Sequence, residues 1–335
     1  MIDKNSIERL SKRLECIDNE LIVSAIEQNE WFSEKSIRRA VRGVVDEFLD
    51  WQKLSNWLCE YGDLSQPARL TTMVVTAGNI PLVGFFDLFC SVLVGERTLL
   101  KPSSRDRVLM SFVAKLMNEE LNAKIDIVDS IDNSADVLLF MGSDAVADEL
   151  MKTWSNKPHL IRSHRTSVAL LSGEESSEQL EALVDDVFAY FGLGCRNVTN
   201  IFIPRGYDLN RLIDVFNRYE IDSPEYQRIV KRHVARLSVC EAEFCAGNFF
   251  VMNEGFSSEL PMGELRWIEY DRVDELECFI NDNESVIQCV VNEFVPMSAW
   301  KCIPFGRAQQ PSLNDFPDRV DTIQFLQKIV TFAKQ

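Results

Sequence analysis

Apolar positions change their spacing along this chain, and the change predicts two kinds of structure. In residues 1–62 apolar residues recur at helical intervals, most clearly in SIRRAVRGVVDEFLDWQKLSNWLCEYG. Ser33 offers a helix start and Gly62 a helix stop. We therefore expect helices that pack over the edge of a sheet, and no residue of this segment suggests chemistry.

From residue 70 onward, short apolar runs with strand character alternate with amphipathic stretches of helical period. The first half predicts strands at 71–77, 97–102, 124–130 and 135–142, and helices at 83–95, 103–121 (capped by Ser103 or Ser104) and 143–154. The second half predicts strands at 164–171, 197–204, 247–253, 264–270 and 285–292, and helices at 176–192, 208–217, 224–237 and 319–334. Such alternation predicts an α/β fold with a parallel sheet, whose ligands bind beyond the carboxyl ends of the strands.

The balance of charge narrows the classes of partner. The 335 residues are 46% hydrophobic and carry a formal net charge of -17, which argues against binding to nucleic acid or to the anionic face of a membrane. The most apolar stretch, 80–94, contains Asp87 and is too short to span a bilayer. Because the charged amino-terminal sequence is unlike a signal peptide, we expect a cytoplasmic protein.

Nine cysteines are scattered over the chain, without the spacing of a disulfide scaffold or of a zinc site, so we expect no metal. Cys195 differs from the rest because it lies in YFGLGCRNVTNIFIP, between the end of an amphipathic helix and a strand. Gly192 and Gly194 allow a tight turn and the approach of another molecule to the sulfur, and Arg196 favours a thiolate. We interpret Cys195 as a nucleophile and the other eight cysteines as core residues.

Polar residues also stand where two of the predicted strands end. Asn79 follows a strand in VTAGNIPLVGF, where its amide could donate to an oxyanion, although an asparagine beside glycine is also a common turn residue. In LLKPSS, Lys101 ends a strand and Ser103 precedes a helix. The lysine could reach a ribose or a phosphate, and the helix start offers N–H groups to an anion, whereas the alternative is a solvated lysine before a capped helix.

A third strand end, in FMGSD, places Gly142 and Ser143 before a helix. The glycine would allow a phosphate to approach the backbone, and the serine would supply a cap hydroxyl. The chain has neither a GxGxxG motif nor a P-loop, so the combination of strand ends carries the prediction of a dinucleotide site. His159, His164 and His233 receive no catalytic role.

Taken together, these segments resemble the acyl-CoA reductase (LuxC-type) family, a branch of the aldehyde dehydrogenase superfamily. The matching pieces occur in the family's order: AGNIPLVGFFDLF, VLVGERTLLKPSSRD, FMGSDAV, RSHRTSVALLSGEE, YFGLGCRNVTNIFIP and FGRAQQPSLNDFPDRVDTIQFL. The resemblance, over residues 70–335, implies an aldehyde-dehydrogenase-like α/β fold with a Rossmann-type cofactor domain and an α/β catalytic domain. The expected divisions are an N-terminal helical segment (1–62), a nicotinamide cofactor-binding domain (63–171), a catalytic domain (172–305) and a C-terminal segment that packs back on the core (306–335).

The resemblance also assigns roles to the residues singled out above. It implies that Cys195 carries a covalent acyl group and that Asn79 stabilises the oxyanion. It implies cofactor contacts near Lys101, Ser103, Gly142 and Ser143. The implied cofactor is NADPH, with NADH as the alternative, and the implied substrate is acyl-CoA or an acyl-carrier thioester, with a fatty acyl group. Members of the superfamily commonly form homo-oligomers, which is the expectation here.

One departure from the superfamily pattern bears on the reaction. Ordinary aldehyde dehydrogenases carry a glutamate base upstream of the cysteine, whereas the corresponding region here, IRSHRTSVALL, has no acid, and Glu174 and Glu175 follow it. A base that activates water would hydrolyse an acyl-enzyme, so its absence favours thioester reduction over aldehyde oxidation.

Three alternatives stay open from the sequence. The first is an acyltransferase or thioesterase that uses Cys195 and a histidine without redox chemistry. The second is an acyl-phosphate reductase of the same superfamily, whose phosphate could bind at RSHRTS. The third is a catalytically silent protein that keeps the fold, which would leave the glycines beside Cys195 unexplained.

Overall fold

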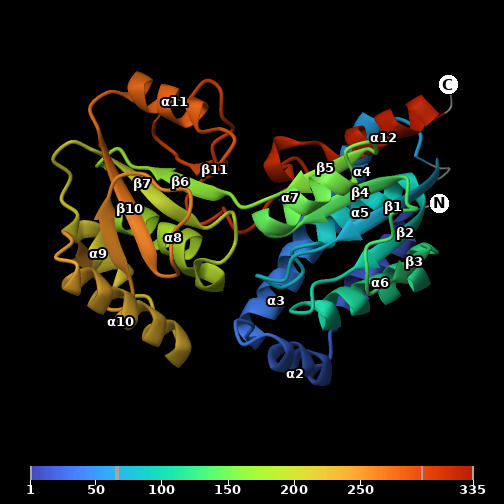
Figure 1. Ribbon diagram of the computed structural model, residues 1–335, viewed down its shortest axis with the longest axis horizontal. Helices are drawn as coiled ribbons and strands as arrows, with labels where there is room; N and C mark the ends of the chain where they lie inside the picture. Colours follow the sequence, from blue (N-terminus) through green and yellow to red (C-terminus); the bar gives the residue numbers. More distant parts are fainter. Residues whose placement is uncertain (1, 65–67, 296, 334–335) are drawn as a thin grey trace. The chain divides into compact units, whose positions relative to one another are not determined.

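The computed structural model describes residues 2–64, 68–295 and 297–333, which divide into two compact units with one sheet each (Figure 1). Unit 1 comprises residues 1–163 and 311–335, and unit 2 comprises residues 164–310. The domain boundaries predicted from the sequence lie after residues 171 and 305 instead. The difference arises because strand β6 (Thr166–Leu170) pairs with strands β7 and β11 of the second sheet.

The sheet of unit 1 has the strand order β3-β2-β1-β4-β5, and every neighbouring pair is parallel. Its strands are β1 (Ala68–Val75), β2 (Gly95–Lys101), β3 (Ile125–Ile127), β4 (Val137–Met141) and β5 (His159–Arg162). Alternate residues face opposite sides, so that Val74 joins one apolar core and Met73 the other. The four strands predicted in this half are confirmed: β1 and β2 begin three and two residues earlier than predicted, and β3 and β4 are shorter than predicted. Strand β5 is an addition.

Helices cover both faces of this sheet. They are α1 (Lys4–Glu15), α2 (Asn19–Gln28), α3 (Glu34–Gly43), α4 (Trp51–Leu58), α5 (Phe85–Val94), α6 (Arg107–Leu121), α7 (Asp144–Thr153) and α12 (Thr322–Ala333). The predicted amino-terminal helices are confirmed, and they share one core with α5, α6 and α12, whereas α7 packs on the opposite face through Ala147 and Leu150. The terminal helix begins at Thr322 rather than at residue 319 and is described as far as Ala333, and residue 334 of its predicted range lies outside the described residues.

The prediction that α6 begins at Ser103 or Ser104 is wrong. Ser103 Oγ accepts the Arg105 N–H group at 3.2 Å, which holds the residues before α6 in a turn. The helix begins at Arg107 and Asp106 occupies its N-cap position. The serines therefore shape the loop between β2 and α6 and do not cap the helix.

A buried ion pair ties the carboxyl-terminal segment into unit 1. The Arg162 guanidinium donates to both carboxylate oxygens of Asp87, at 3.0 and 3.1 Å. It also donates to the Thr322 hydroxyl at 2.8 Å and to the Pro317 carbonyl oxygen. Because both charges are buried and fully hydrogen-bonded, this cluster fixes the end of β5 and the start of α12 together.

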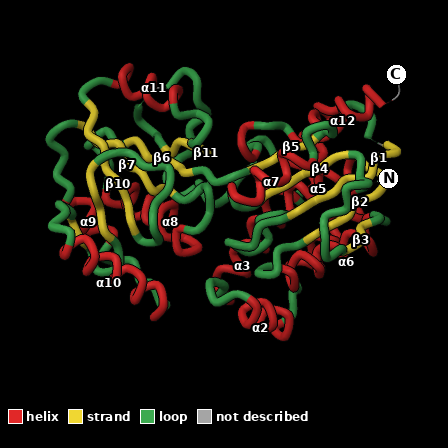
Figure 2. The backbone as a smooth tube through the Cα atoms, viewed as in Figure 1, coloured by secondary structure: helices red, strands yellow, loops and turns green. Residues whose placement is uncertain are grey.

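The sheet of unit 2 has the order β11-β6-β7-β10-β9-β8, parallel except for the β8–β9 pair (Figure 2). Beside β6, its strands are β7 (Val198–Pro204), β8 (Cys245–Ala246), β9 (Val251–Glu254), β10 (Glu264–Tyr270) and β11 (Ile287–Val291). Its helices are α8 (Ser177–Phe188), α9 (Asn210–Phe216), α10 (Pro224–Val239) and α11 (Val273–Asp282). Leu276 and Ile280 of α11 pack on β6, β7 and β11, whereas Phe188 of α8 stacks among aromatic rings that include Phe216 and Phe249.

Candidate active site

Three adjacent strand ends bring five of the six predicted site residues to one edge of the unit 1 sheet. Strand β1 lies between β2 and β4, with Val75 opposite Lys101 on one side and Phe140 on the other. Because the three strands are parallel, their carboxyl ends share an edge. The predicted residues at this edge are Asn79, Lys101, Ser103, Gly142 and Ser143.

The strand order makes this edge a ligand-binding position by its topology. In the order β3-β2-β1-β4-β5 the chain winds outward in one direction from β1 and then returns to place β4 on its other side. Ligands of open parallel sheets bind at such a switch point, beyond the carboxyl ends of the two strands. Here the loops that follow β1 and β4 diverge at that point, and they carry Asn79 and Ser143 respectively.

The loop that carries Asn79 is pressed against the turn that carries Ser103. A Cβ atom at Gly78 would lie 2.7 Å from Ser103 Oγ and 3.0 Å from the Cβ atom of Arg105. Only glycine fits this contact without a shift of the neighbouring turn. Close packing therefore explains the glycine at position 78, where the loop after β1 contacts the turn after β2.

Two buried side chains hold the same loop on either side of Asn79. Asn29 Nδ2 donates to the Gly78 carbonyl oxygen at 2.9 Å. Asp106 Oδ2 accepts the Leu82 N–H group at 2.9 Å, where Leu82 has the left-handed backbone angle φ of 58°. Burial raises the pKa of the Asp106 carboxyl well above its usual range. Sequence reasoning missed both residues, although Asp106 stands in the LKPSSRD segment.

Gly142 and Ser143 directly precede α7, and packing within the protein gives a second reason for the glycine. A Cβ atom at Gly142 would lie 2.5 Å from the Phe140 ring, so packing within the protein already requires glycine there. Ser143 is the N-cap residue and is exposed, but its side chain makes no capping hydrogen bond. The N-cap side chain therefore does not cap α7, and the first turn of this helix also carries the carboxylate of Asp144.

Cys195 lies in unit 2 and is exposed. It follows a kinked turn, Ala189–Gly192, whose inner residues do not have helical backbone angles, and it precedes β7. Tyr190, Phe191 and Gly192 have φ angles of 53°, 59° and 73°, so three consecutive residues adopt the left-handed conformation. Such a kink is costly unless its surroundings hold it, and it reverses the chain between α8 and the cysteine.

Asn197 stabilises this turn by hydrogen bonds to the backbone on both sides of the kink. Its side chain is fully buried, its Oδ1 atom accepts the Gly194 N–H group at 2.8 Å, and its backbone N–H donates to the Gly194 carbonyl oxygen at 3.0 Å. Its Nδ2 atom lies 2.8 to 3.1 Å from three carbonyl oxygens at the end of α8, those of Asp186, Val187 and Ala189. The sequence analysis quoted Asn197 within the motif but gave it no role.

Further contacts tie the backbone of Cys195 and its neighbour to the unit. The buried Ser167 hydroxyl donates to the Cys195 carbonyl oxygen at 2.8 Å. Arg196 Nε donates to the Ala308 carbonyl oxygen at 2.5 Å. The buried Asp186 carboxylate accepts the Ala308 N–H group at 2.8 Å. The FGRAQQ segment is thus hydrogen-bonded both to Arg196 and to Asp186 of α8.

The other cysteines correct one expectation. Cys90 and Cys289 are buried as predicted, but Cys16, Cys59, Cys240 and Cys278 are exposed. Cys16, Cys59 and Cys240 each occupy the C-cap of a helix, where side chains face solvent. Exposure alone therefore does not single out Cys195, and the glycine-flanked turn does.

The acids and bases near the strand ends of unit 2 are engaged in structural contacts. Glu175 is buried, and it accepts the Ser172 N–H group at 2.5 Å and the Ser172 hydroxyl at 2.8 Å. His233 Nε2 lies 2.6 Å from the buried Glu264 carboxylate, and His164 Nε2 lies 3.0 Å from the Ser258 carbonyl oxygen. Glu175 therefore shapes its own loop and is not placed as a solvent-activating base.

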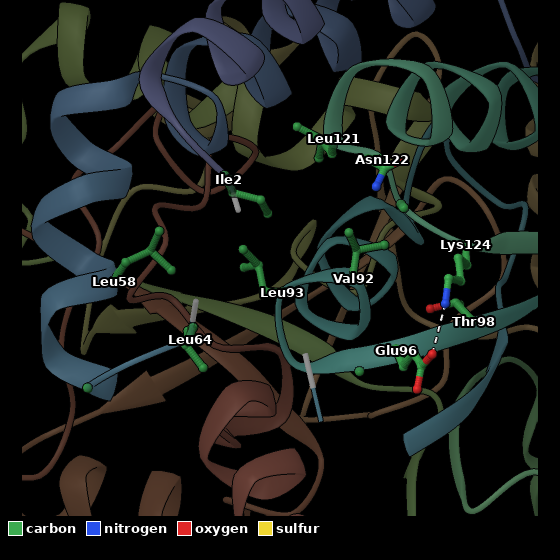
Figure 3. A pocket seen from close by; sticks show the side chains of 13 residues that line it. Ile2, Leu58, Leu64, Val92, Leu93, Glu96, Thr98, Leu121, Asn122 and Lys124 are labelled. Carbon is green, nitrogen blue, oxygen red and sulfur yellow. Dashed lines mark hydrogen bonds and ion pairs between the residues drawn. The ribbon is translucent and has the colours of Figure 1, made fainter. Parts of the chain in front are cut away.

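A separate cavity of about 420 Å³ lies at the opposite edge of the unit 1 sheet (Figure 3). Leu58, Leu93 and Leu121 contribute to its apolar walls. At its rim Lys124 Nζ pairs with Glu96 at 2.8 Å, which lowers the pKa of the Glu96 carboxyl. Glu96 stands at the amino end of β2, so this cavity is distinct from the edge that carries Asn79.

Within the described residues, no helix is both long and apolar enough to cross a membrane. Over residues 2–64, 68–295 and 297–333, no three His, Cys, Asp or Glu side chains gather in a way that could hold a metal ion.

A parallel sheet with a topological switch point, together with a second α/β unit that presents a cysteine before a central strand, defines the aldehyde dehydrogenase fold. Similar solved structures include P. syringae AldA, an indole-3-acetaldehyde dehydrogenase mutant in complex with NAD+ and IAA, with 13% identity, a TM-score of 0.66, and coverage of 89% of this chain and 72% of that chain. Aldehyde dehydrogenase 21 from Physcomitrella patens has 13% identity, a TM-score of 0.68, and coverage of 98% and 83%. A Mycobacterium tuberculosis aldehyde dehydrogenase complexed with NAD+ has 15% identity, a TM-score of 0.60, and coverage of 83% and 70%.

The family follows from the sequence itself. The model of the acyl-CoA reductase (LuxC) family matches residues 34–212, which is more than half of the chain. The chain therefore belongs to the acyl-CoA reductase (LuxC) family. It is an oxidoreductase of the class that reduces acyl groups to aldehydes. No curated protein sequence matches it.

Proposed function

We propose that this protein reduces a fatty acyl thioester, carried on coenzyme A or on an acyl carrier, to the aldehyde with NADPH, through an acyl group bound to Cys195. The observation that carries the proposal is the exposed cysteine in a kinked, internally fixed turn before β7. Family membership supports the reaction class, because the family model describes acyl-CoA reductases.

The chemistry that we propose for Cys195 balances as follows. Its thiolate sulfur attacks the thioester carbonyl carbon, which forms a carbon–sulfur bond and a tetrahedral oxyanion. Collapse of this oxyanion breaks the bond to the carrier, whose thiolate takes up a proton and leaves. A nicotinamide cofactor, when bound, supplies the hydride that reduces the acyl group. The aldehyde then leaves as the Cys195 sulfur is released and protonated.

Asn79 is the proposed donor to the oxyanion, because an amide fixed at a strand end costs no reorganisation during the reaction. The two contacts that hold its loop, from Asn29 to Gly78 and from Asp106 to Leu82, support such a preorganised role. A backbone N–H group at Cys195 is the proposed second donor. Both assignments extend the family resemblance to numbered positions of this chain.

The edge of unit 1 fits a dinucleotide. The switch point between β1 and β4 supplies the position, and the uncapped first turn of α7 after Ser143 suits the pyrophosphate. Lys101, half-buried at the end of β2, and Ser103 in the turn after it would contact the ribose or its 2′-phosphate. Arg105 is exposed on the same turn, which favours NADPH, with NADH as the alternative. The solved neighbours that contain NAD+ support a nicotinamide cofactor.

The upstream region also supports a reductase that does not hydrolyse its acyl-enzyme. In the upstream region IRSHRTSVALL, which has no acid, Arg162 is committed to the buried pair with Asp87. Glu175 is bound by amide groups of its own loop. Within the described residues, the corresponding strand thus offers no carboxylate to activate water.

We further propose a reducing, cytoplasmic setting, because all nine cysteines are free thiols. The acidic net charge of -17 is consistent with a small-molecule thioester as the partner rather than nucleic acid. A homo-oligomer remains the expectation for a member of this superfamily.

The proposed function is tested by following NADPH absorbance with medium-chain and long-chain acyl-CoA, an acyl carrier thioester and an acyl phosphate. We expect oxidation of NADPH with a thioester, and its loss in Cys195→Ser but not in Cys240→Ser, which removes an exposed thiol of unit 2. Release of the carrier thiol without oxidation of NADPH would indicate an acyltransferase or a thioesterase. Oxidation with the acyl phosphate alone would indicate an acyl-phosphate reductase.

A further inference from the structure

The end of helix α2 reaches the edge of the sheet where Asn79 lies. Gln28, the last residue of α2, accepts the Val108 N–H group on its Oε1 atom at 3.0 Å, in the first turn of α6. The next residue, Asn29, is 4% exposed and donates from Nδ2 to the Gly78 carbonyl oxygen at 2.9 Å. Two adjacent side chains of the amino-terminal segment thus bind this edge, Gln28 at the first turn of α6 and Asn29 at the loop after β1.

The contact from Asn29 controls the peptide plane that leads into Asn79. Asn29 Oδ1 accepts the Trp31 N–H group at 3.0 Å, and this bond orients the amide so that Nδ2 faces Gly78. The Gly78 carbonyl and the Asn79 nitrogen belong to one planar peptide unit. Fixing that carbonyl oxygen therefore fixes the direction in which the Asn79 side chain leaves the backbone.

Close packing further restricts the loop that carries Asn79. Gly78 already touches the turn of Ser103, where an added Cβ atom would lie 2.7 Å from Oγ, so the loop cannot move toward that turn. On the other side of Asn79, the Leu82 N–H group is bound by Asp106. Asn29 is thus the polar contact on the amino side of Asn79, and Asp106 is the one on the carboxyl side.

We propose that Asn29 is a positioning residue for acyl transfer, and that it acts by aiming the Asn79 amide through the Gly78 peptide. This inference rests on the proposed function of Asn79 as the oxyanion donor. It gives the amino-terminal helices a role in the reaction, as the source of a hydrogen bond to a loop 49 residues away. Asn29 itself contacts neither substrate nor cofactor in this role.

The test is a double-mutant cycle on the rate of acylation, measured in the full chain as release of free coenzyme A from an acyl-CoA without NADPH. We expect Asn29→Ala to slow acylation about 10-fold, since small misplacements of a catalytic group have effects of this order or larger. In the Asn79→Ala background, the same substitution should change the rate less than about 2-fold, because the group that it positions is gone. Equal losses in both backgrounds would overturn the proposal.

Asn118→Ala is the matched control in the same unit. Asn118 also makes two hydrogen bonds with the backbone, at 2.9 Å each to the Ile125 N–H group and carbonyl oxygen, at the opposite edge of the sheet. We expect it to lower the melting temperature as Asn29→Ala does, while acylation keeps the wild-type rate. A similar loss of acylation in Asn118→Ala would show that general destabilisation is the cause, and would overturn the proposal.

A second variant and a second readout cover the case in which Asn29→Ala folds poorly. Asn29→Asp keeps the acceptor for Trp31 and the side-chain size but replaces the donor that faces Gly78. We expect faster amide hydrogen exchange across residues 77–83 in this variant, with no change in Asn118→Ala, whatever substrate is used. Unchanged exchange would overturn the proposal. Absence of acylation at Cys195 in the wild type would instead overturn the proposed function.

Discussion

The loop that carries Asn79 and the turn that carries Cys195 are both held by buried polar side chains. These side chains differ in how far they lie, along the sequence, from the segments that they hold. Asn197 reaches back only 8 to 11 residues to the end of α8. Asn29 and Asp106 reach their partners across 49 and 24 residues. The asparagine that holds the Cys195 turn is thus its near neighbour in sequence, although Ser167 and Ala308 also bind Cys195 and Arg196, from 28 and 112 residues away. The Asn79 loop instead depends on the assembled amino-terminal helices and α6. Substitutions in the two regions should therefore fail in different ways.

The largest expected effect is at Cys195, the proposed nucleophile. Cys195→Ala should reduce turnover of the thioester by about 10,000-fold or more, because the covalent step has no substitute. The folded structure should be unaffected, since the side chain is exposed. Steady-state NADPH oxidation and a thermal melt measure both. Residual turnover within about 10-fold of wild type would assign the acyl group to another cysteine.

Loss of the oxyanion donor should come next. Asn79→Ala should raise the barrier to acylation by about 3 kcal/mol, the usual size for one such donor. The effect belongs in the rate constant of acyl transfer rather than in affinity for NADPH. Single-turnover acylation and an NADPH titration separate the two. A variant that loses NADPH affinity but acylates at the wild-type rate would move Asn79 from the oxyanion to the cofactor.

The clamp under Cys195 should show itself mainly as stability. Asn197→Ala leaves the Gly194 N–H group and the carbonyl oxygens at the end of α8 without their buried partner, which should cost about 2–3 kcal/mol of the free energy of unfolding. Chemical denaturation measures the loss. Asn248→Ala is a suitable control, because Asn248 is an exposed asparagine of the same unit. Equal stability of the two variants would mean that the kinked turn holds itself.

The smallest expected effect depends on pH and involves Asp106. Burial raises the pKa of its carboxyl in the folded protein, so the unfolded chain ionises first as pH rises. The wild type therefore loses stability as pH rises from about 4, the value of an unperturbed aspartate, through the raised pKa of the folded state. Asp106→Asn keeps an acceptor for Leu82 and removes this loss.

Melting temperatures of both proteins across the pH range provide the measurement for Asp106. We expect the variant to be the more stable protein by a few degrees at neutral pH, with the difference shrinking in acid. A difference that grows as pH falls would reverse the assignment, because it would mean that the ionised carboxylate is the stabilising form.

Sequence patterns predict most of the strands because strands depend on local features, whereas the roles of the motif residues stay predictions. The apolar runs around β1, β2 and β4 and the polar residues just after them can be read without tertiary contacts. Helix α11 was missed, although Leu276, Phe279 and Ile280 have helical spacing, because acidic residues surround them. Strand β5 has only four residues, which is too short for alternation to show.

The contacts that hold the site could not be predicted, because they join residues far apart in sequence. Nothing in the residues around Asn29 indicates a partner at Gly78. From the sequence, Gly142 is explained by the close approach of a phosphate, whereas the Phe140 ring beside it already requires glycine. The prediction that the other eight cysteines are core residues is wrong for Cys16, because this residue occupies a helix C-cap and faces solvent.

Mass spectrometry of the protein after incubation with an acyl-CoA, without NADPH, tests the central claim most directly. Peptide mapping of the acylated chain distinguishes Cys195 from the other exposed thiols, of which Cys240 and Cys278 lie in the same unit. We predict one acyl group on Cys195, and its loss with formation of the aldehyde when NADPH is added. Acylation of another cysteine, or an acyl group on Cys195 that NADPH leaves in place, would contradict the account.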